Sequence, residues 1–296
     1  MATLKALRIR IGSVSSSEKI TGAMKMISSA KVHKNEMELK KLLPFRNQVK
    51  SIMGHLLETN LEFNSPLITE REVKHIGIVV YGSDDGLCGA YNTNIYKYLL
   101  TQIEELREKC GNKVKFTVLP VGKKMVNAVK KLHAEGITVE ITEGVDSKMN
   151  GEKVNDFTQS LRERFEQGVI DLISVVYMRF VSRSRQIPSY EQLFPVSKNA
   201  LEGDAVSIKS DNKDYIFEPD PNSIFNEVLP MFVLSTMQEI TIENRASEQA
   251  ARVMAMQSAN DNAKKLLEEL QLEYNKLRQQ AITTELLDIL GGQVGR

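Results

Sequence analysis

The chain has 296 residues, of which 42% are hydrophobic, 26% charged and only 6% aromatic, and its formal net charge is +1. Its two cysteines, Cys88 and Cys110, are too few for a disulfide framework and lack the neighbours of a metal site, so we expect free thiols and no bound metal. No apolar run reaches the roughly 18 residues that span a membrane, and no secretory signal opens the chain, which predicts a cytosolic protein.

The first segment, residues 1–58, is predicted to form one long helix. Apolar residues recur at steps of three and four, beginning with Leu4, Leu7, Ile11 and Val14. Residues 31–41 are polar on almost all sides, which suggests a helix that crosses solvent, and Pro44 is expected to kink the helix or to mark a joint.

The charge of this first segment is distinctive. It carries 11 Lys and Arg against 4 Asp and Glu, whereas residues 59–221 carry 21 against 24 and residues 222–296 carry 7 against 10. A basic arm could meet nucleic acid, an anionic membrane or an acidic protein, or it could be an ordinary solvated helix face.

The middle segment, residues 59–221, is expected to form a small α/β domain. Strands are predicted at residues 74–81, 113–120, 137–142 and 170–181, helices at 92–108, 123–133 and 152–167, and a further extended stretch at 186–195. Alternation of strands and helices at this spacing predicts an open, mostly parallel sheet with helices on both faces.

The loop after the first strand, residues 82–89 (GSDDGLCG), lies where phosphate-binding loops lie in α/β folds. Its glycine spacing fits neither the dinucleotide nor the P-loop pattern. We therefore expect a tight turn that lets the next helix pack on the sheet, with Asp84 and Asp85 as turn-forming residues. Because the metalloprotease and serine hydrolase motifs are also missing from the sequence, we expect no catalytic and no cofactor-binding residues.

The third segment, residues 222–296, is predicted to be a second long helix. Residues 231–290 contain neither glycine nor proline, and Gly291 and Gly292 offer a natural stop. A ridge of small residues recurs at steps of four and would let another helix approach closely: Ala251, Ala255, Ala259 and Ala263. The simplest role for Met24, Met26, Met254 and Met256 is packing between the two helices. On helix geometry alone Arg252 is a solvated charge.

Together the segments predict an α/β fold in which a long antiparallel coiled coil of N- and C-terminal helices carries a central Rossmann-like α/β domain inserted between them. The amino-terminal arm would be ~83 Å long and the carboxy-terminal arm ~104 Å, so the latter extends roughly 20 Å beyond its partner. This overhang carries Leu277, Ile282, Leu286, Leu287, Ile289 and Leu290. An exposed apolar helix end is typical of a binding surface, so we expect something outside the chain to enclose it.

Three stretches of the sequence resemble the gamma subunits of F-type ATP synthases. They are Glu18–Met26 (EKITGAMKM), Ser83–Gly89 (SDDGLCG), and the run from Ser247–Arg252 (SEQAAR) through Asp261–Ala263 (DNA) to Tyr274–Thr283 (YNKLRQQAIT). The resemblance covers essentially the whole chain. A chance similarity of two coiled coils would not reproduce the central loop as well.

The resemblance implies a rotor shaft that performs no bond chemistry. The terminal helices would lie inside a ring of alternating alpha and beta subunits, and the α/β domain would sit with the epsilon subunit on the membrane ring of c subunits. Rotation driven by protons or sodium ions would then act on the catalytic sites of beta. The resemblance implies no cofactor, no nucleic acid partner, a membrane link only through the Fo sector, and a peripheral place on the cytoplasmic face of the bacterial plasma membrane.

Contact residues follow from the same resemblance. Arg278, Gln279 and Thr283 resemble the tip residues that bond a loop of beta. Met24 and Arg252 resemble the pair near the acidic lever loop of beta, which would give the basic arm an acidic partner. Tyr215 resembles the aromatic residue that touches the c ring.

The sequence also departs from the family pattern. Gly22 stands where a longer polar residue is usual, Asp85 where Arg is common, and residues 15–17 (SSS) replace an amide-rich stretch. Glycine at position 22 should cost about 1 kcal/mol relative to alanine in a helix interior.

Two other classes of protein fit parts of the sequence. A nucleotide-using α/β enzyme with a coiled-coil dimerisation arm would need the 82–89 loop to bind phosphate. A coiled-coil adaptor could bind nucleic acid through the basic arm, although few aromatic residues interleave its Lys and Arg, as stacking on bases would require.

Overall fold

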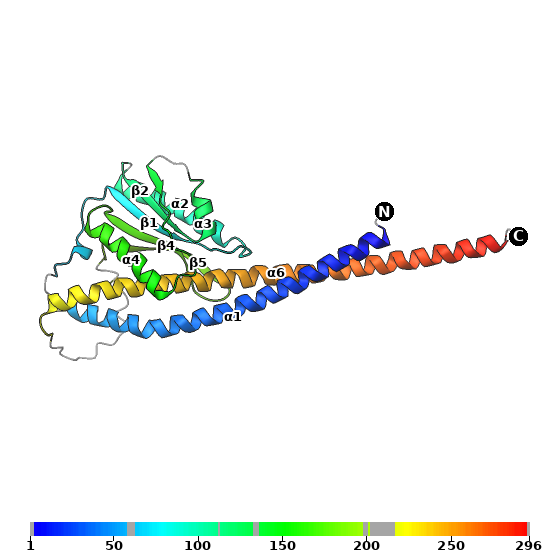
Figure 1. Ribbon diagram of the computed structural model, residues 1–296, viewed down its shortest axis with the longest axis horizontal. Helices are drawn as coiled ribbons and strands as arrows, with labels where there is room; N and C mark the ends of the chain where they lie inside the picture. Colours follow the sequence, from blue (N-terminus) through cyan, green and yellow to red (C-terminus); the bar gives the residue numbers. More distant parts are fainter. Residues whose placement is uncertain are drawn as a thin grey trace. The chain divides into compact units, whose positions relative to one another are not determined.

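A computed structural model describes residues 3–57, 63–111, 113–132, 136–197, 201 and 217–294. The chain divides into two compact units, one of residues 30–251 and one that combines residues 1–29 with 252–296. Two long helices, α1 (Leu4–Leu57) and α6 (Pro221–Val294), contribute to both units (Figure 1). Helix α1 ends at Leu57 and α6 begins at Pro221, next to residues 58 and 222, where the sequence predicts domain boundaries, whereas the two compact units divide at 29/30 and 251/252.

The unit of residues 30–251 contains one five-stranded sheet with the order β3-β2-β1-β4-β5. Its strands are β1 (His75–Tyr81), β2 (Lys115–Val121), β3 (Ile137–Val139), β4 (Leu172–Phe180) and β5 (Gln186–Phe194). The pairs β1–β2, β1–β4 and β2–β3 are parallel, and β5 is antiparallel to β4. The mostly parallel sheet is confirmed, and its strands β1 to β4 have the 3-2-1-4 order with which the Rossmann sheet begins.

Helices cover both faces of this sheet, as the sequence predicts (Figure 1). They are α2 (Tyr91–Cys110), α3 (Lys123–Val129) and α4 (Gly151–Glu166), together with the inner parts of α1 and α6; a 3-10 turn, η1, spans Pro66–Ile68. Alternate residues of β1 point to opposite faces: Ile76, Ile78 and Val80 join a core with α2 and α3, whereas Val79 and Tyr81 join a core with α1, α4 and α6.

Prolines and glycines interrupt the helices less than their sequence positions predict. Helix α1 continues through Pro44, so Pro44 is not a joint between two helices. Pro44 and Lys40 are both exposed, so water can hydrate the Lys40 carbonyl that the proline leaves without a donor. The stop expected at Gly291 and Gly292 is also wrong, because α6 runs on to Val294; glycine weakens a helix without forbidding it.

Two other elements are shorter than expected. Helix α3 ends at Val129 rather than near His133, which lies outside the described residues, and β3 ends at Val139 rather than at Thr142.

The 82–89 loop is the tight turn that the sequence predicts. A Cβ atom on Gly82 would lie 2.5 Å from the Cβ of Met125 on α3, so only glycine fits this close approach. Asp84 bridges loops that are distant in sequence: its carboxylate accepts hydrogen bonds from the Lys123 backbone N–H at 2.9 Å and the Ser147 hydroxyl at 2.7 Å. Gly82 and Asp84 thus have structural roles in this loop.

Candidate functional site

The unit formed by residues 1–29 and 252–296 contains an antiparallel pair of helices with a heptad seam. On α1 the buried or half-buried positions include Leu4, Leu7, Ile11, Val14, Glu18, Thr21, Lys25 and Ser28. On α6 they include Arg252, Met256, Ala259, Ala263, Leu266, Leu270 and Leu277. Steps of three and four on both helices are typical of coiled-coil packing. Ala259 and Ala263 of the expected ridge lie on this seam, whereas Ala251 belongs to the unit of residues 30–251 and packs on its core.

Polar side chains set the register of this seam between residues 18–25 of α1 and residues 257–260 of α6. Asn260, which is 6% exposed, donates hydrogen bonds to the backbone carbonyl of Glu18 at 2.7 Å and to Oγ1 of Thr21 at 3.3 Å. Lys25 Nζ donates to Oε1 of Gln257 at 2.8 Å. A sliding of one helix past the other would leave these buried polar groups without partners, which is how a polar residue in a seam specifies register.

Gly22 provides the space that Asn260 occupies. A Cβ atom added to Gly22 would lie 3.3 Å from the Asn260 side-chain nitrogen, which is tighter than ordinary van der Waals contact. The helix-propensity cost of this glycine is therefore offset by the hydrogen bonds of Asn260. Sequence reasoning identified Gly22 as unusual but missed Asn260, whose signal was an amide directly beside the seam position Ala259.

The pairing register of α1 and α6 shows which residue of α6 lies opposite the beginning of α1. Extending the pairs Glu18–Asn260, Thr21–Asn260 and Lys25–Gln257 one for one toward the amino terminus places Leu4 opposite residues 274–278. From Arg278 to Leu290 every residue of α6 whose side chain is described is exposed. The carboxy-terminal end therefore extends past the amino-terminal end, as Figure 1 shows, and the expected overhang is confirmed.

The expected tip residues lie on this overhang, which we call the tip (residues 278–294). Arg278, Gln279 and Thr283 are exposed, and the Thr283 hydroxyl donates to the Gln279 carbonyl at 2.9 Å. Large apolar side chains share the tip, with exposed fractions from 48% to 62%: Ile282, Leu286, Leu287, Ile289 and Leu290. Leu277, which the sequence groups with them, is half-buried at the end of the seam.

Met24 and Arg252, which the resemblance groups together, lie on the paired part of α1 and α6, away from the tip. Met24 is half-buried, and Arg252 is only 4% exposed, so its interpretation as a solvated charge is wrong. Arg252 stands at a heptad position, where packing covers its side chain. Met256 packs as expected, at 6% exposed, but Met26 and Met254 are 66% and 49% exposed because they stand beside the seam rather than on it. Tyr215 lies outside the described residues.

A cluster of half-buried and buried charges, which sequence reasoning missed, lies in the unit of residues 30–251. Arg46 Nη1 on α1 lies 2.8 Å and 2.7 Å from the two carboxylate oxygens of Glu239 on α6. Burial raises the pKa of Glu239 even so, against the lowering effect of Arg46. One turn along α6, burial raises the pKa of the Glu243 carboxyl to about 7, with a further contribution from Glu239.

The described part of the chain holds no group of three or more His, Cys, Asp or Glu residues that could bind a metal ion. Within the same ranges, no helix is both long and apolar enough to cross a bilayer. Cys88 is buried and Cys110 half-buried, and both are free thiols, as predicted.

Comparisons with known proteins agree over nearly the whole chain. A family profile described as ATP synthase matches residues 3–294. The ATP synthase gamma chain of Bacteroides thetaiotaomicron is 36% identical over 99% of this chain and 100% of its own length. That of Phocaeicola vulgatus is 38% identical with the same coverage.

Solved structures show a similar fold. The rotor of the Euglena gracilis mitochondrial ATP synthase, in rotational state 1, matches with a TM-score of 0.60 at 18% identity, covering 94% of this chain and 98% of that one. A chain of the same organism's OSCP/F1/c-ring assembly, in rotational state 3, matches with a TM-score of 0.61 at 19% identity, covering 99% and 94%.

Proposed function

The chain belongs to the ATP synthase family as one of its gamma chains, and from this membership we propose that it is the central shaft of a proton- or sodium-driven rotary enzyme. In this role it couples rotation of the membrane c ring to conformational changes at catalytic sites on the beta subunits. The chain performs no bond chemistry and needs no cofactor. Neither a nucleotide enzyme nor a nucleic-acid adaptor is needed to explain its features.

The tip is the observation that carries the proposal. Five large apolar side chains are exposed on its helix, beyond the point where α1 can pair with it. Apolar helix surface of this kind marks an interaction site or an aggregation liability. A ring of alternating alpha and beta subunits around the coiled coil supplies the missing cover. Arg278, Gln279 and Thr283 then hydrogen-bond a loop of beta.

Other contacts follow the same arrangement. Met24 and Arg252 lie near the acidic lever loop of beta, which complements the basic amino-terminal arm. Tyr215 contacts the c ring, and the epsilon subunit binds beside it at the base of the stalk. The chain thus reaches the membrane only through the Fo sector, as a peripheral subunit on the cytoplasmic face of the bacterial plasma membrane.

The polar seam suits a helix pair that transmits torque. An element can bias a catalytic site only if its interaction free energy differs between the conformations of that site. An asymmetric shaft meets this condition, because it presents a different face to each beta subunit as it turns. Hydrogen bonds from Asn260 and Lys25 resist sliding of the two helices, so an applied torque turns the pair together.

Removing the polar groups of the tip tests this function. Arg278→Ala combined with Gln279→Ala should lower coupled ATP synthesis of the assembled complex, while circular dichroism and thermal unfolding of the chain stay unchanged because both side chains are exposed. The matched control is Glu268→Ala with Glu269→Ala, two adjacent exposed residues on the same helix within the paired region. Synthesis at the control's rate by the tip variant would remove the role assigned to the tip.

A further inference from the structure

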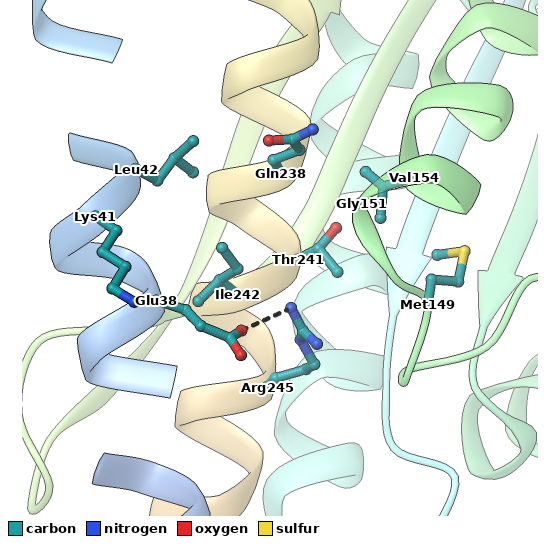
Figure 2. Close-up of a pocket in the computed structure, with 10 residues that line it drawn as sticks. All are labelled: Glu38, Lys41, Leu42, Met149, Gly151, Val154, Gln238, Thr241, Ile242 and Arg245. Carbon is teal, nitrogen blue, oxygen red and sulfur yellow. Dashed lines mark ion pairs between the residues drawn. The ribbon is translucent and has the colours of Figure 1, made fainter. Parts of the chain in front are cut away.

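A cavity of about 360 Å³ lies within the unit of residues 30–251. It is lined by α1, by α6 and by the beginning of α4 with the residues just before it, as Figure 2 shows. Its volume is in the range of small-ligand sites. Nothing in the rotor function uses this cavity.

The charged end of the cavity is built around Arg245 of α6. Its Nη2 atom lies 3.5 Å from Oε2 of Glu38 on α1, longer than the 2.7–2.9 Å of a good charge-assisted hydrogen bond. Its Nε atom is buried and has no hydrogen-bond partner among the described residues. A guanidinium group has five N–H donors and no acceptor. Glu38 therefore satisfies Arg245 only in part.

The charge around Arg245 favours an anion. Lys41 also lines the cavity, so its three charged residues, Glu38, Lys41 and Arg245, sum to one positive charge. The neutral polar residues have partners already: Gln238 donates to Asn155 at 2.8 Å, and the Thr241 hydroxyl lies 2.8 Å from that of Tyr81. The guanidinium, whose buried Nε atom has no partner among the described residues, and the Lys41 ammonium are thus the cationic donors that line the cavity.

Much of the remaining cavity lining is apolar. Met149 and Val154 are 1% and 2% exposed and belong to the core beneath α4. Leu42 of α1 and Ile242 of α6 add apolar side chains on the side of α6 that faces α1. Figure 2 shows these side chains arranged around the stretch of α6 that leads to Arg245. A ligand that fits must combine an acidic group with a short apolar body.

We propose that this cavity binds a small organic carboxylate with an apolar body, whose carboxylate pairs with Arg245 and whose carbon chain packs on Met149, Val154 and Ile242. The structure favours a carboxylate over a phosphate because a carboxylate, that of Glu38, already lies against Arg245, and because the apolar lining suits a carbon chain, which inorganic phosphate lacks. In this arrangement Glu38 competes with the ligand for the guanidinium group.

Calorimetric titration of the full-length chain with hexanoate at fixed ionic strength tests the site. Saturable binding of one hexanoate per chain is expected. 1-Hexanol lacks the carboxylate and inorganic phosphate lacks the carbon chain, so each should bind at least tenfold more weakly. Arg245→Gln should weaken hexanoate binding at least tenfold, because it removes a charge-assisted pair. Glu38→Gln should strengthen it, because the competing carboxylate is gone.

The two variants break the same ion pair and are expected to act in opposite directions, so a general loss of structure cannot mimic the result. Arg183→Gln is the matched control, since it breaks the exposed ion pair with Glu36 on α1, at 2.8 Å, and should leave hexanoate affinity unchanged. The proposal is overturned if hexanoate does not saturate, if hexanol or phosphate binds equally well, or if Glu38→Gln weakens binding as Arg245→Gln does. These outcomes are independent of ATP synthesis.

Discussion

The buried carboxyl of Glu243 should make the stability of the chain depend on pH. Glu243 is 9% exposed, and burial raises its pKa from 4.5 to about 7. Glu239 and Glu191 raise it further, whereas Arg179 and Arg46 lower it. Replacing Glu243 by glutamine removes the titration while it keeps the shape of the protonated acid.

The sign and size of the effect follow from linkage. A carboxyl whose pKa is higher in the folded state contributes its stability fully below the unfolded pKa, and this contribution is lost as the pH rises from about 4.5 to about 7. One pKa unit corresponds to about 1.4 kcal/mol, so the full difference is at most about 3 kcal/mol. Because Glu239 is close and its pKa is also raised, the two carboxyls titrate as a pair, which spreads the transition.

Urea unfolding of the wild-type chain and of Glu243→Gln between pH 4.5 and pH 8 tests this reasoning. The two proteins should be of similar stability at pH 4.5, and the variant should become the more stable one as the pH rises. Glu227→Gln, an exposed glutamate on the same helix, is the control and should leave the pH profile unchanged. A stability difference for Glu243→Gln that is equal at pH 4.5 and pH 8 would refute the argument.

Further predictions concern the seam and the 82–89 loop. Gly22→Ala should leave the stability of the wild-type chain unchanged or lower it, but should stabilise an Asn260→Ala chain by about 1 kcal/mol. A double-mutant cycle measured by urea unfolding tests this, and simple additivity of the two substitutions would contradict a contact between Gly22 and Asn260. Gly82→Ala should destabilise by about 1–3 kcal/mol, because its Cβ would overlap Met125; an unchanged thermal midpoint would disprove the clash. Asp84→Ala should cost about 2 kcal/mol by loss of its hydrogen bonds, whereas Asp84→Asn, which retains an acceptor, should cost less in the same assay.

Regular patterns made most of the fold predictable. The apolar strand of residues 76–81 alternates between two cores, and the stretch without glycine or proline at residues 231–290 is helical throughout. The overhang followed from comparing two helix lengths. Helix interruptions were less predictable, as Pro44 and Gly291 show, because the remainder of each helix compensates for the local cost of one proline or glycine.

The candidate site was predictable only where it is exposed. Arg278, Gln279 and Thr283 lie on the tip because they follow the end of the seam. The burial of Arg252 and Asn260 was harder to predict, since a polar residue on a helix is expected to face solvent until the heptad register of both helices is known. The cavity at Arg245 depends on three elements that are distant in sequence, and no local pattern could reveal it.

Rotation of the chain inside its complex is the most direct test of the account. A bead attached to Lys109→Cys, an exposed position near the end of α2, in a Cys110→Ser background would report movement of the shaft while the beta subunits are fixed to a surface. Cys88 is 3% exposed and can stay in place. ATP should drive the bead in one direction. A bead that stays still or moves without direction, while the complex hydrolyses ATP at its full rate, would contradict the assignment of this chain as the rotor.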